Sequence, residues 1–346
     1  MTENTESRGA DQEEIGNPIF IVGMNGSGTT MLLDCISHHP DLYAFPKETR
    51  IIPFLIARAA SLGDLDADEN FRKLWGVVLG QKIFEYENGD MRISPPDNWR
   101  SYPRNLESVL NWTFAYFAGK EGKSRWCEKS PHNIQHISQI SSLFPGAQFI
   151  HVIRDGRDCA ASFHRRWMRT PALTIHRWKM VLREGRRQGS SMGPGLYLEV
   201  KYEELTTDTE RCLRAICEFL HTPYNKAILQ SNQPYLEGWV GGNSVARAGE
   251  LVPNSEKWRT YFSEKNIVVL ESIGGKTLGD FGYETEQPNA DRNLSPLKVR
   301  WLSTRDSIVQ YAREIFLKVT GRIGRPWRVI LLRPFQSIRH RKYNRF

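Results

Sequence analysis

The chain has 346 residues, 40% of them hydrophobic, and a formal net charge of +8. This length can bury one large α/β core or two small ones, and a mean hydropathy of −0.50, without an apolar run of about 18 residues, argues against an ordinary membrane-spanning helix. Residues 286–346 hold 14 Lys and Arg against 4 Asp and Glu, so this segment carries +10 and the rest of the chain −2. A body without excess positive charge is not expected to bind nucleic acid.

The N-terminal residues and the cysteines indicate the cellular compartment in which the protein is expected. Residues 1–16 are polar and acidic, and we expect them to form a disordered tail. They have neither the basic start nor the apolar stretch of a secretory signal. The five cysteines form no CxxC pair and no metal-ligand cluster, which is typical of reduced, buried thiols. These features favour a cytoplasmic protein.

The first predicted elements are a strand, a glycine-rich turn and a helix. The apolar run 19–22 is typical of a buried parallel strand, and residues 31–37 are expected to form a helix. Between them, Gly23-x-x-x-x-Gly28 has the spacing of a phosphate-binding P-loop. Glycines let backbone N–H groups converge on an anion, and the first N–H groups of a helix have no partner within it. This stretch therefore predicts an anion cradle.

The residue after the loop indicates which kind of anion can bind there. Thr29 stands where nucleoside triphosphatases carry the lysine that contacts the β- and γ-phosphates, which argues against ATP or GTP hydrolysis. We predict a site for one phosphate-sized anion, where the hydroxyls of Ser27, Thr29 and Thr30 join the backbone N–H groups. A glycine turn that merely connects strand to helix is the alternative.

A charged segment follows at 47–50, between two apolar stretches. Glu48 lies about twenty residues beyond the anion loop, and a carboxylate there can sit at the mouth of the same cleft. The alternative is a solvated turn in which Glu48 caps the helix expected through 54–56. The residues alone leave these two interpretations equal.

Residues 60–125 differ in character from the stretches on either side. They are rich in Trp, Gly, Asn and Pro, with helices expected near 69–83 and 105–118. An aromatic-rich insertion between two strands is suited to form acceptor-binding walls. Ordinary surface helices packed on the sheet are the alternative.

Three further strands are predicted, at 126–127, 149–153 and 196–200, and helical stretches separate them. Strand and helix alternate throughout 17–285. The sequence therefore predicts an α/β fold with a central parallel sheet and helices on both faces.

Polar residues follow two of these strands. Lys129 ends the second strand, at the sheet edge where ligands lie in open parallel sheets, although a lone lysine is usually solvated. Arg154 follows the third strand, and Ser162 lies about two helical turns later. A guanidinium and a hydroxyl so placed can grip a second phosphate. The alternative is a structural RDGRD turn stabilised by its own ion pairs.

Taken together, four segments resemble the sulfotransferases that use 3′-phosphoadenosine 5′-phosphosulfate (PAPS). The segments are IFIVGMNGSGTT, FIHVIRDGRDCAASF, VKYEEL and EKWRTYF, in this order, and the resemblance covers about 17–285. HPDLYAFPKETRIIP and CEKSPHNIQHISQISSLFPGAQFIHVIRDGR are similar to the tyrosylprotein sulfotransferase branch in particular. The resemblance implies the P-loop NTPase-like sulfotransferase fold and the transfer of a sulfuryl group from PAPS to a hydroxyl of a glycan, lipid or phenol.

The resemblance also implies roles for individual residues. Glu48 is expected to be the general base and Lys129 a cation on the transferring sulfuryl group. Arg154 and Ser162 are expected to hold the 3′-phosphate. The loop residues expected to hold the 5′-phosphosulfate are Gly26, Ser27, Gly28, Thr29 and Thr30, and the residues expected to help on the nucleotide side are Arg166, Tyr202 and Lys257. Because the donor already carries its activation, no metal is expected.

The sequence departs from the family pattern at Gly26, where the family usually has Arg or Lys in contact with the leaving phosphate. Loss of one preorganised donor costs about 10²–10³ in rate. Lys47, Arg50 or Lys129 can substitute, or the chain is a catalytically weakened, nucleotide-binding relative. A small-molecule P-loop kinase is the third hypothesis, opposed by the missing lysine. The tyrosylprotein branch is membrane-anchored and luminal, whereas we expect a cytoplasmic protein here, so a protein-tyrosine acceptor is not carried over.

The basic C-terminal extension, 286–346, is expected to be helical. Ile308, Ala312, Ile315 and Val319 fall on one face of a helix over 307–320. Three interpretations of this segment stay open. It packs on the core, it contacts an anionic membrane surface as a peripheral protein at the inner face, or it docks an acidic acceptor.

Overall fold

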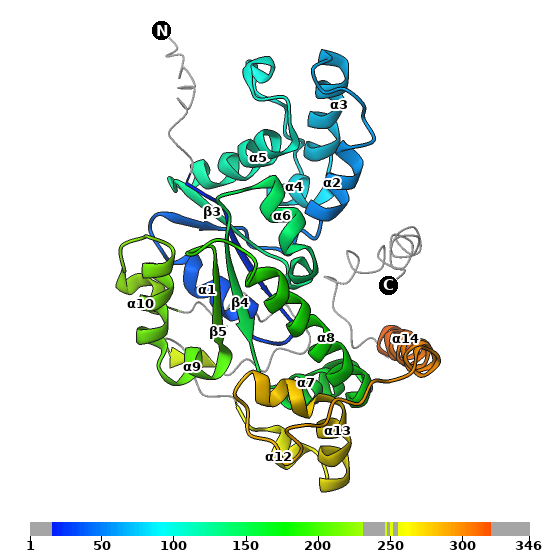
Figure 1. Cartoon of the computed structure of the whole chain (residues 1–346). Coiled ribbons are helices and arrows are strands. Elements are labelled where there is room, and N and C mark those ends of the chain that lie inside the picture. The colour runs from blue at the N-terminus through cyan, green and yellow to red at the C-terminus, as the bar shows by residue number, and fades with distance from the viewer. Residues whose placement is uncertain (1–15, 231–245, 248–249, 252–254, 320–346) are drawn as a thin grey trace.

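The computed structural model describes residues 16–230, 246–247, 250–251 and 255–319. Five parallel strands form one sheet in the order β2-β3-β1-β4-β5. Helices lie on either side of this sheet (Figure 1). The predicted α/β fold with a central parallel sheet is confirmed. The strands are β1 (Ile19–Gly23), β2 (Leu42–Ala44), β3 (Arg125–Lys129), β4 (Gln148–Ile153) and β5 (Tyr197–Lys201).

The helices follow the strands in an alternating order. They are α1 (Thr29–Ser37), α2 (Ile52–Ala59), α3 (Asp68–Leu79), α4 (Lys82–Glu87), α5 (Leu106–Lys120), α6 (Ile137–Leu143), α7 (Gly156–Trp167), α8 (Pro171–Gly189), α9 (Tyr202–Thr207), α10 (Thr209–Phe219), α12 (Trp258–Tyr261), α13 (Glu264–Asp280) and α14 (Pro296–Val319). Short 3-10 helices lie at Trp99–Ser101, Pro131–His136 and Lys226–Leu229, and β6 (Ala246–Arg247) pairs with β7 (Glu250–Leu251). Apart from Gly16, the expected N-terminal tail lies outside the described residues.

The central strand β1 explains why the sheet is buried on both faces. All five of its residues are buried, and successive side chains point to opposite faces. Phe20 joins an aromatic cluster with Trp126 and Phe149 on one face. Ile19 and Ile21 belong to a second cluster on the other face, which includes residues of α1 and α10. The continuous apolar run of β1 is thus the pattern of a strand covered on both sides.

The strand register determines where polar side chains gather. Ile21 lies opposite Lys129 of β3, and Gly23 lies opposite Val152 of β4. Because the strands are parallel, their carboxyl ends share one edge, the edge at which open α/β sheets bind ligands. The start of the glycine loop, Lys129 and Arg154 therefore come to the same edge of the sheet.

The insertion between β2 and β3 packs against the aromatic face of the sheet. Helices α3 and α5 occupy most of the two helical stretches predicted there. The ring of Phe114 in α5 stacks on Trp126 of β3 with centroids 4.3 Å apart, and Trp75 of α3 meets Trp112 of α5 at 5.3 Å. Trp75 and Trp126 are fully buried, so these two tryptophans belong to the core rather than to an open wall.

Beyond residue 285 the chain continues to pack on α8. Asp306 of α14 is 1% exposed, and its carboxylate accepts hydrogen bonds from Thr170 N at 3.0 Å and Thr170 Oγ1 at 2.6 Å. Leu302 is also buried. The predicted apolar stripe points elsewhere, because Ile308 is 63% and Ile315 43% exposed. Helix α14 thus contacts the body through the face opposite that stripe.

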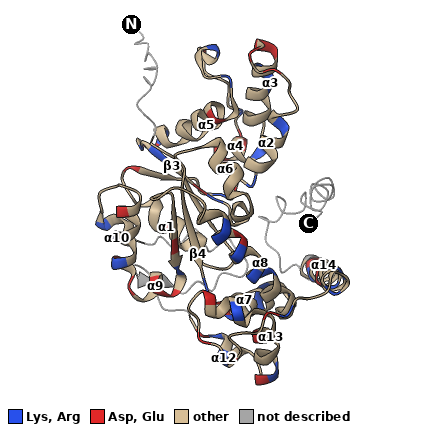
Figure 2. Ribbon diagram, in the orientation of Figure 1, with Lys and Arg blue, Asp and Glu red and all other residues tan. Residues whose placement is uncertain are grey.

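Helix α14 begins eleven residues before the predicted helix start at 307 and carries charges of both signs along its length (Figure 2). The more basic part of the expected extension, 320–346, lies outside the described residues. Among the helices of the described ranges, none combines the length and the apolar character needed to cross a membrane.

Candidate active site

The glycine loop between β1 and α1 adopts a conformation that only glycine tolerates well. Gly26 has φ 85° and Gly28 has φ 102°, both in the left-handed region. A Cβ at Gly28 would overlap the ring of Tyr202, so the absence of a side chain lets that ring lie on the loop. Gly28 is the N-cap of α1, and no side chain caps this helix end. The first N–H groups of α1 are therefore open to an anion.

Two buried hydroxyls near the loop have no hydrogen-bond partner among the described residues. Ser27 is completely buried in the loop, and Ser162 of α7 is 6% exposed. Burying a hydroxyl without a partner is unfavourable, so such groups call for an explanation. An oxyanion bound beside each hydroxyl would supply the missing acceptor. These residues fit the predicted phosphate and phosphosulfate ligands.

Arg154, Tyr202 and the glycine loop form one packed unit. Arg154 Nη1 donates to the carbonyl oxygen of Gly26 at 3.1 Å, and the guanidinium lies 4.1 Å from the centre of the Tyr202 ring. Both side chains are buried at about the same level, 6% exposed each. The cation is thereby held in a fixed orientation beside the loop.

Four of the residues expected at the nucleotide line one small pocket, whereas the fifth, Tyr202, packs against Arg154 instead. Arg154, Ser162 and Arg166 come from the end of β4 and from α7, and Lys257 comes from a segment about a hundred residues later. Burial and the neighbouring Arg154 and Arg165 lower the pKa of Arg166. Cations that repel one another gain stability when an anion binds among them. The full lining is Arg154, Asp158, Ala161, Ser162, Arg165, Arg166, Lys257 and Tyr261.

Asp158 also lines this pocket and was not predicted. Its Oδ1 accepts a hydrogen bond from Trp258 N at 3.0 Å, which ties the segment that carries Lys257 to α7. Burial raises the pKa of Asp158 to about 6, against the opposing effect of Arg154. The sequence does not mark Asp158 as a pocket residue, because it is only the second of two aspartates in the RDGRD turn.

The rest of the RDGRD turn is structural, as the alternative interpretation proposed. Arg157 is 3% exposed and pairs with Asp155 at 2.7 Å and with Glu271 at 2.5 Å. Its guanidinium also lies 3.8 Å from the ring centre of Trp258. One short turn thus sends Arg154 to the pocket and Arg157 into the core.

Glu48, Lys129 and Thr30 meet at the other side of the loop. Lys129 Nζ lies 2.9 Å from Glu48 Oε1 and 3.2 Å from Thr30 Oγ1. Arg50 Nε donates to Glu48 Oε2 at 2.8 Å. Burial alone would raise the pKa of Glu48, but Lys129 and Arg50 outweigh burial and the pKa lies below its usual value. The carboxylate is therefore ionised at neutral pH.

The alternative role of Glu48, as the cap of a helix, is not seen. Helix α2 begins at Ile52 with Ile51 as N-cap, and no side chain caps it. Lys47, the neighbour of Glu48, pairs with Glu87 of α4 at 2.8 Å and lies 3.6 Å from the ring centre of Tyr86. The charged segment therefore connects the sheet edge to the insertion.

Glu128 is the second site-proximal carboxylate that sequence reasoning missed. It precedes Lys129 in β3 and is 0% exposed. Burial raises its pKa, although hydrogen bonds from Ser130 and Thr49 oppose that rise. The only signal in the sequence is an acidic residue directly after a short predicted strand, which does not reveal its partners.

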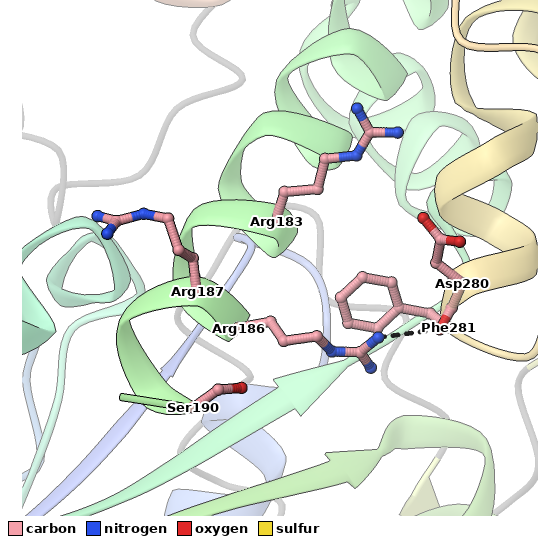
Figure 3. A pocket seen from close by; sticks show the side chains of 6 residues that line it. All are labelled: Arg183, Arg186, Arg187, Ser190, Asp280 and Phe281. Atoms are coloured by element: carbon pink, nitrogen blue, oxygen red, sulfur yellow. Dashed lines mark hydrogen bonds between the residues drawn. The ribbon is translucent and has the colours of Figure 1, made fainter. Parts of the chain in front are cut away.

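A larger hollow lies elsewhere, between α8 and the end of α13 (Figure 3). Its lining contains none of the predicted site residues. Its three arginines are already paired, Arg183 with Asp291, Arg186 with Glu199 and Arg187 with Glu184. We therefore place the candidate active site at the sheet edge. Within the described ranges, no group of three or more His, Cys, Asp or Glu is placed to hold a metal ion, and the expectation that no metal is needed stays a prediction.

This architecture is that of known sulfotransferase domains. The sulfotransferase domain of the curacin biosynthetic pathway superposes with a TM-score of 0.54 at 20% identity, over 78% of this chain and 98% of that domain. The sulfotransferase domain of the Synechococcus PCC 7002 olefin synthase gives 0.52 at 23% identity, over 80% and 98%. The predicted P-loop-like sulfotransferase fold is confirmed.

The sequence comparison identifies the family. The model of the sulfotransferase family matches residues 18–226, which is more than half of the chain. The chain therefore belongs to the sulfotransferase family. Among curated relatives, protein-tyrosine sulfotransferase 1 from Danio rerio is 26% identical over 237 residues, covering 66% of this chain. The match spans 59% of that relative's length.

The comparison corrects one prediction. We expected a cytoplasmic protein, possibly peripheral at the inner face of a membrane, from its unpaired cysteines and N-terminal residues. Curated relatives from Danio rerio, Drosophila melanogaster and Mus musculus are protein-tyrosine sulfotransferases, the branch that the sequence resemblance describes as membrane-anchored and luminal. That expectation is wrong. All five cysteines are buried and free, and buried thiols report on packing rather than on the compartment.

Proposed function

We propose that the protein transfers a sulfuryl group from PAPS to a hydroxyl acceptor. The observation that carries the proposal is the position of Lys129. Its ammonium group contacts both Glu48, at 2.9 Å, and Thr30 at the start of α1, at 3.2 Å. One cation therefore joins a carboxylate suited to be a base to the loop suited to hold an anion. Such a junction is what transfer between an anionic donor and a hydroxyl requires.

The nucleotide side of the proposal rests on the small pocket. Arg154 and Ser162 would hold the 3′-phosphate, and Arg166 and Lys257 of the same pocket would help on the nucleotide side. Tyr202, packed beneath Arg154, would help there as well. The unpartnered hydroxyls of Ser27 and Ser162 support two separate anionic groups, one at the glycine loop and one at the pocket. Gly26, Gly28, Thr29 and Thr30 would complete the loop that holds the 5′-phosphosulfate.

The chemistry assigned to the residues is proton removal and charge stabilisation. PAPS supplies a sulfuryl group that is already activated. Glu48, ionised because Lys129 and Arg50 lower its pKa, would take the proton of the acceptor hydroxyl as the new S–O bond forms. Lys129 would stabilise negative charge on the sulfuryl group and on the departing phosphate. Of the three candidate substitutes for the cation missing at Gly26, Lys129 is the one that contacts the loop.

The acceptor side is proposed to lie along the insertion 60–125, within a sulfotransferase domain of 17–285. Lys47, next to the base, is paired with Glu87 and stacked on Tyr86 of α4, which brings this helix to the entrance of the site. Glycans, lipids and phenols all carry suitable hydroxyls. A tyrosine phenol is the first acceptor to test, because curated relatives such as the Danio rerio protein are protein-tyrosine sulfotransferases.

Calorimetry followed by transfer assays tests the function. The protein should bind 3′,5′-adenosine bisphosphate and not ATP, and should move labelled sulfate from PAPS to at least one acceptor in a panel of tyrosine peptides, phenols, glycans and lipids. Binding of the bisphosphate without transfer would instead support the weakened relative, which Gly26 suggests. Preferential binding of ATP would contradict the proposal.

Replacement of the base separates binding from chemistry. Glu48→Gln should keep the affinity for the bisphosphate near wild type, because Glu48 does not line the nucleotide pocket. Turnover should fall by about 10²–10⁴, the range for removal of a positioned general base. Turnover within a few-fold of wild type would show that the proton leaves by another route.

A further inference from the structure

Glu128 holds the segment that carries the proposed base. Its carboxylate accepts four hydrogen bonds although it is completely buried. Oε1 accepts from Thr49 N at 3.2 Å, from Thr49 Oγ1 at 2.9 Å and from Ser130 Oγ at 2.5 Å, and Oε2 accepts from Asn133 Nδ2 at 2.9 Å. A buried carboxylate is costly unless its oxygens are satisfied in this way.

The bonds converge on the residues that follow Glu48. Thr49 is fixed through its backbone and its hydroxyl, and Arg50 N donates to Ser130 Oγ at 3.0 Å. Arg50 has φ 54°, a left-handed conformation that is unfavourable for a residue with a Cβ. The Glu128 network therefore supports a strained turn. The same turn places Arg50 Nε 2.8 Å from the Glu48 carboxylate.

Strand geometry explains why Glu128 and Lys129 act on the same segment from opposite sides. Neighbouring side chains of a strand point to opposite faces. Lys129 reaches the Glu48 carboxylate and Thr30, whereas Glu128 reaches the backbone and hydroxyl of Thr49. Two consecutive residues of β3 thus hold one loop at two points, one at the side chain and one at the backbone.

We propose that Glu128 is a positioning residue for Glu48, which it keeps within reach of Lys129 by anchoring Thr49 and Arg50. This inference rests on the proposed function, in which Glu48 is the base. It assigns no contact between Glu128 and either substrate. The consequence is that turnover depends on the hydrogen bonds of Glu128, whereas nucleotide binding does not.

A matched pair of threonine variants tests the proposal. Thr49→Val removes the hydroxyl that donates to Glu128 and keeps the backbone N–H. Thr170→Val removes the equivalent hydroxyl from the buried Asp306, which also accepts from both the N–H and the hydroxyl of one threonine. Thr170 Oγ1 additionally accepts from Arg305 Nη1 at 2.9 Å, so its loss should lower the melting temperature at least as much.

Only the Thr49 variant should affect chemistry. We expect Thr49→Val to lower kcat by about tenfold, within the cost of a displaced catalytic group, with the KM for PAPS and bisphosphate binding unchanged. Thr170→Val should leave kcat within about twofold of wild type. A loss of kcat that merely follows the loss of melting temperature in both variants would overturn the proposal, and so would unchanged kcat in Thr49→Val.

Variants of Glu128 separate geometry from charge. Glu128→Gln keeps an acceptor oxygen for Thr49 and Ser130. Its amide can donate to Asn133 Oδ1, which has no partner among the described residues, once the Asn133 amide turns its Nδ2 away from this position. We expect it to retain most of the turnover, whereas Glu128→Ala should lower kcat by about 10², the cost of misplacing a reacting group by about 1 Å. Equal losses in both would contradict a positioning role. If Glu128→Ala does not fold, the Thr49 and Gln variants decide.

A titration of Glu48 tests the positioning without any transfer assay. Lys129 and Arg50 lower the pKa of Glu48, so a loosened loop should raise it. Carbon-detected NMR should show this rise in Thr49→Val and not in Thr170→Val, and the acidic limb of the kcat profile should move to higher pH with it. An unchanged Glu48 titration overturns the inference. An enzyme without transfer activity but with the expected titration would contradict the proposed function alone.

Discussion

Two buried hydroxyls without partners among the described residues lie on either side of the proposed nucleotide site. Ser27 and Ser162 lie on different elements, one in the glycine loop and one in α7, and neither donates to a described residue. An ordinary core would replace such hydroxyls by apolar atoms or pair them. A site for two anions explains both residues at once. Substitutions near the 3′-phosphate and near the 5′-phosphosulfate should therefore have different effects.

Ser162→Ala should act on the 3′-phosphate alone. A hydrogen bond to a charged group contributes about 1.5–3 kcal/mol, so the affinity for 3′,5′-adenosine bisphosphate should fall by about tenfold or more. Calorimetry with adenosine 5′-phosphate, which lacks the 3′-phosphate, provides the control and should show little change. Arg154→Ala should give the same pattern with a larger loss. Equal losses for both nucleotides would place these residues elsewhere.

Asp158 makes the pocket sensitive to pH. Its carboxylate lines the same pocket as Arg154 and Ser162, and burial raises its pKa to about 6. Below this pKa the group is neutral and does not oppose a phosphate, whereas above it the negative charge repels one. Asp158→Asn keeps the oxygen that accepts from Trp258 N and removes the charge.

We therefore expect Asp158→Asn to bind the bisphosphate at least about tenfold more tightly than wild type at pH 7.5, and nearly equally at pH 5. At each pH, the ratio of the variant's affinity to the wild-type affinity is compared, because the titration of the ligand's own phosphate groups affects both proteins equally and cancels in this ratio. The same group affects stability, because a carboxyl with a raised folded pKa stabilises the fold at low pH and loses that effect as pH rises through about 6. A constant affinity ratio between pH 5 and 7.5 would show that Asp158 stays uncharged or lies away from the phosphate.

At the scale of elements, strong local patterns predicted the strand-loop-helix unit and the strand β4. Their apolar runs and the glycine spacing can be recognised from neighbouring residues alone, without knowing which other segments pack against them. Helix α8 was not predicted, because its buried face carries the charged Lys179, whose acidic partner Asp291 lies far away in the sequence. Glu128 escaped notice for the same reason. Burial of a charge depends on partners that only the folded chain brings together.

The glycine loop tests whether the missing cation matters. Gly26 has φ 85°, and a Cβ there would lie 3.2 Å from the ring of Phe163. Gly26→Arg should therefore destabilise the loop by about 1–2 kcal/mol, the cost of a left-handed residue with a side chain. Turnover and bisphosphate affinity should both fall.

Phe163→Ala combined with Gly26→Arg separates crowding from charge. If the ring alone obstructs the arginine, the double variant should recover bisphosphate affinity but not exceed the wild-type rate, because Lys129 already serves the loop. A large gain in turnover in either variant would show instead that the enzyme is weakened by lack of a cation at Gly26.

At the scale of the whole molecule, the body of the fold extends past the segment that resembles the sulfotransferases. Lys179 of α8 is completely buried, and its ammonium group contacts Asp291 Oδ1 at 2.8 Å and the carbonyl oxygen of Arg292 at 3.0 Å. Asp306 in turn binds the start of α8 through Thr170. Residues between α13 and the middle of α14 therefore neutralise and cap the helix that packs on β4.

Removal of Asp291 should expose the cost of burying the Lys179 charge. Asp291→Ala should lower the free energy of unfolding by about 3–5 kcal/mol, because it leaves the Lys179 ammonium buried without a carboxylate. Lys179→Met in the same background removes the charge and should restore most of the loss. Denaturant unfolding measures both variants, and bisphosphate binding by the folded protein should stay unchanged, since neither residue lines the nucleotide pocket. An Asp291→Ala protein as stable as wild type would show that Lys179 is satisfied without Asp291, and that residues beyond 285 are not needed to neutralise α8.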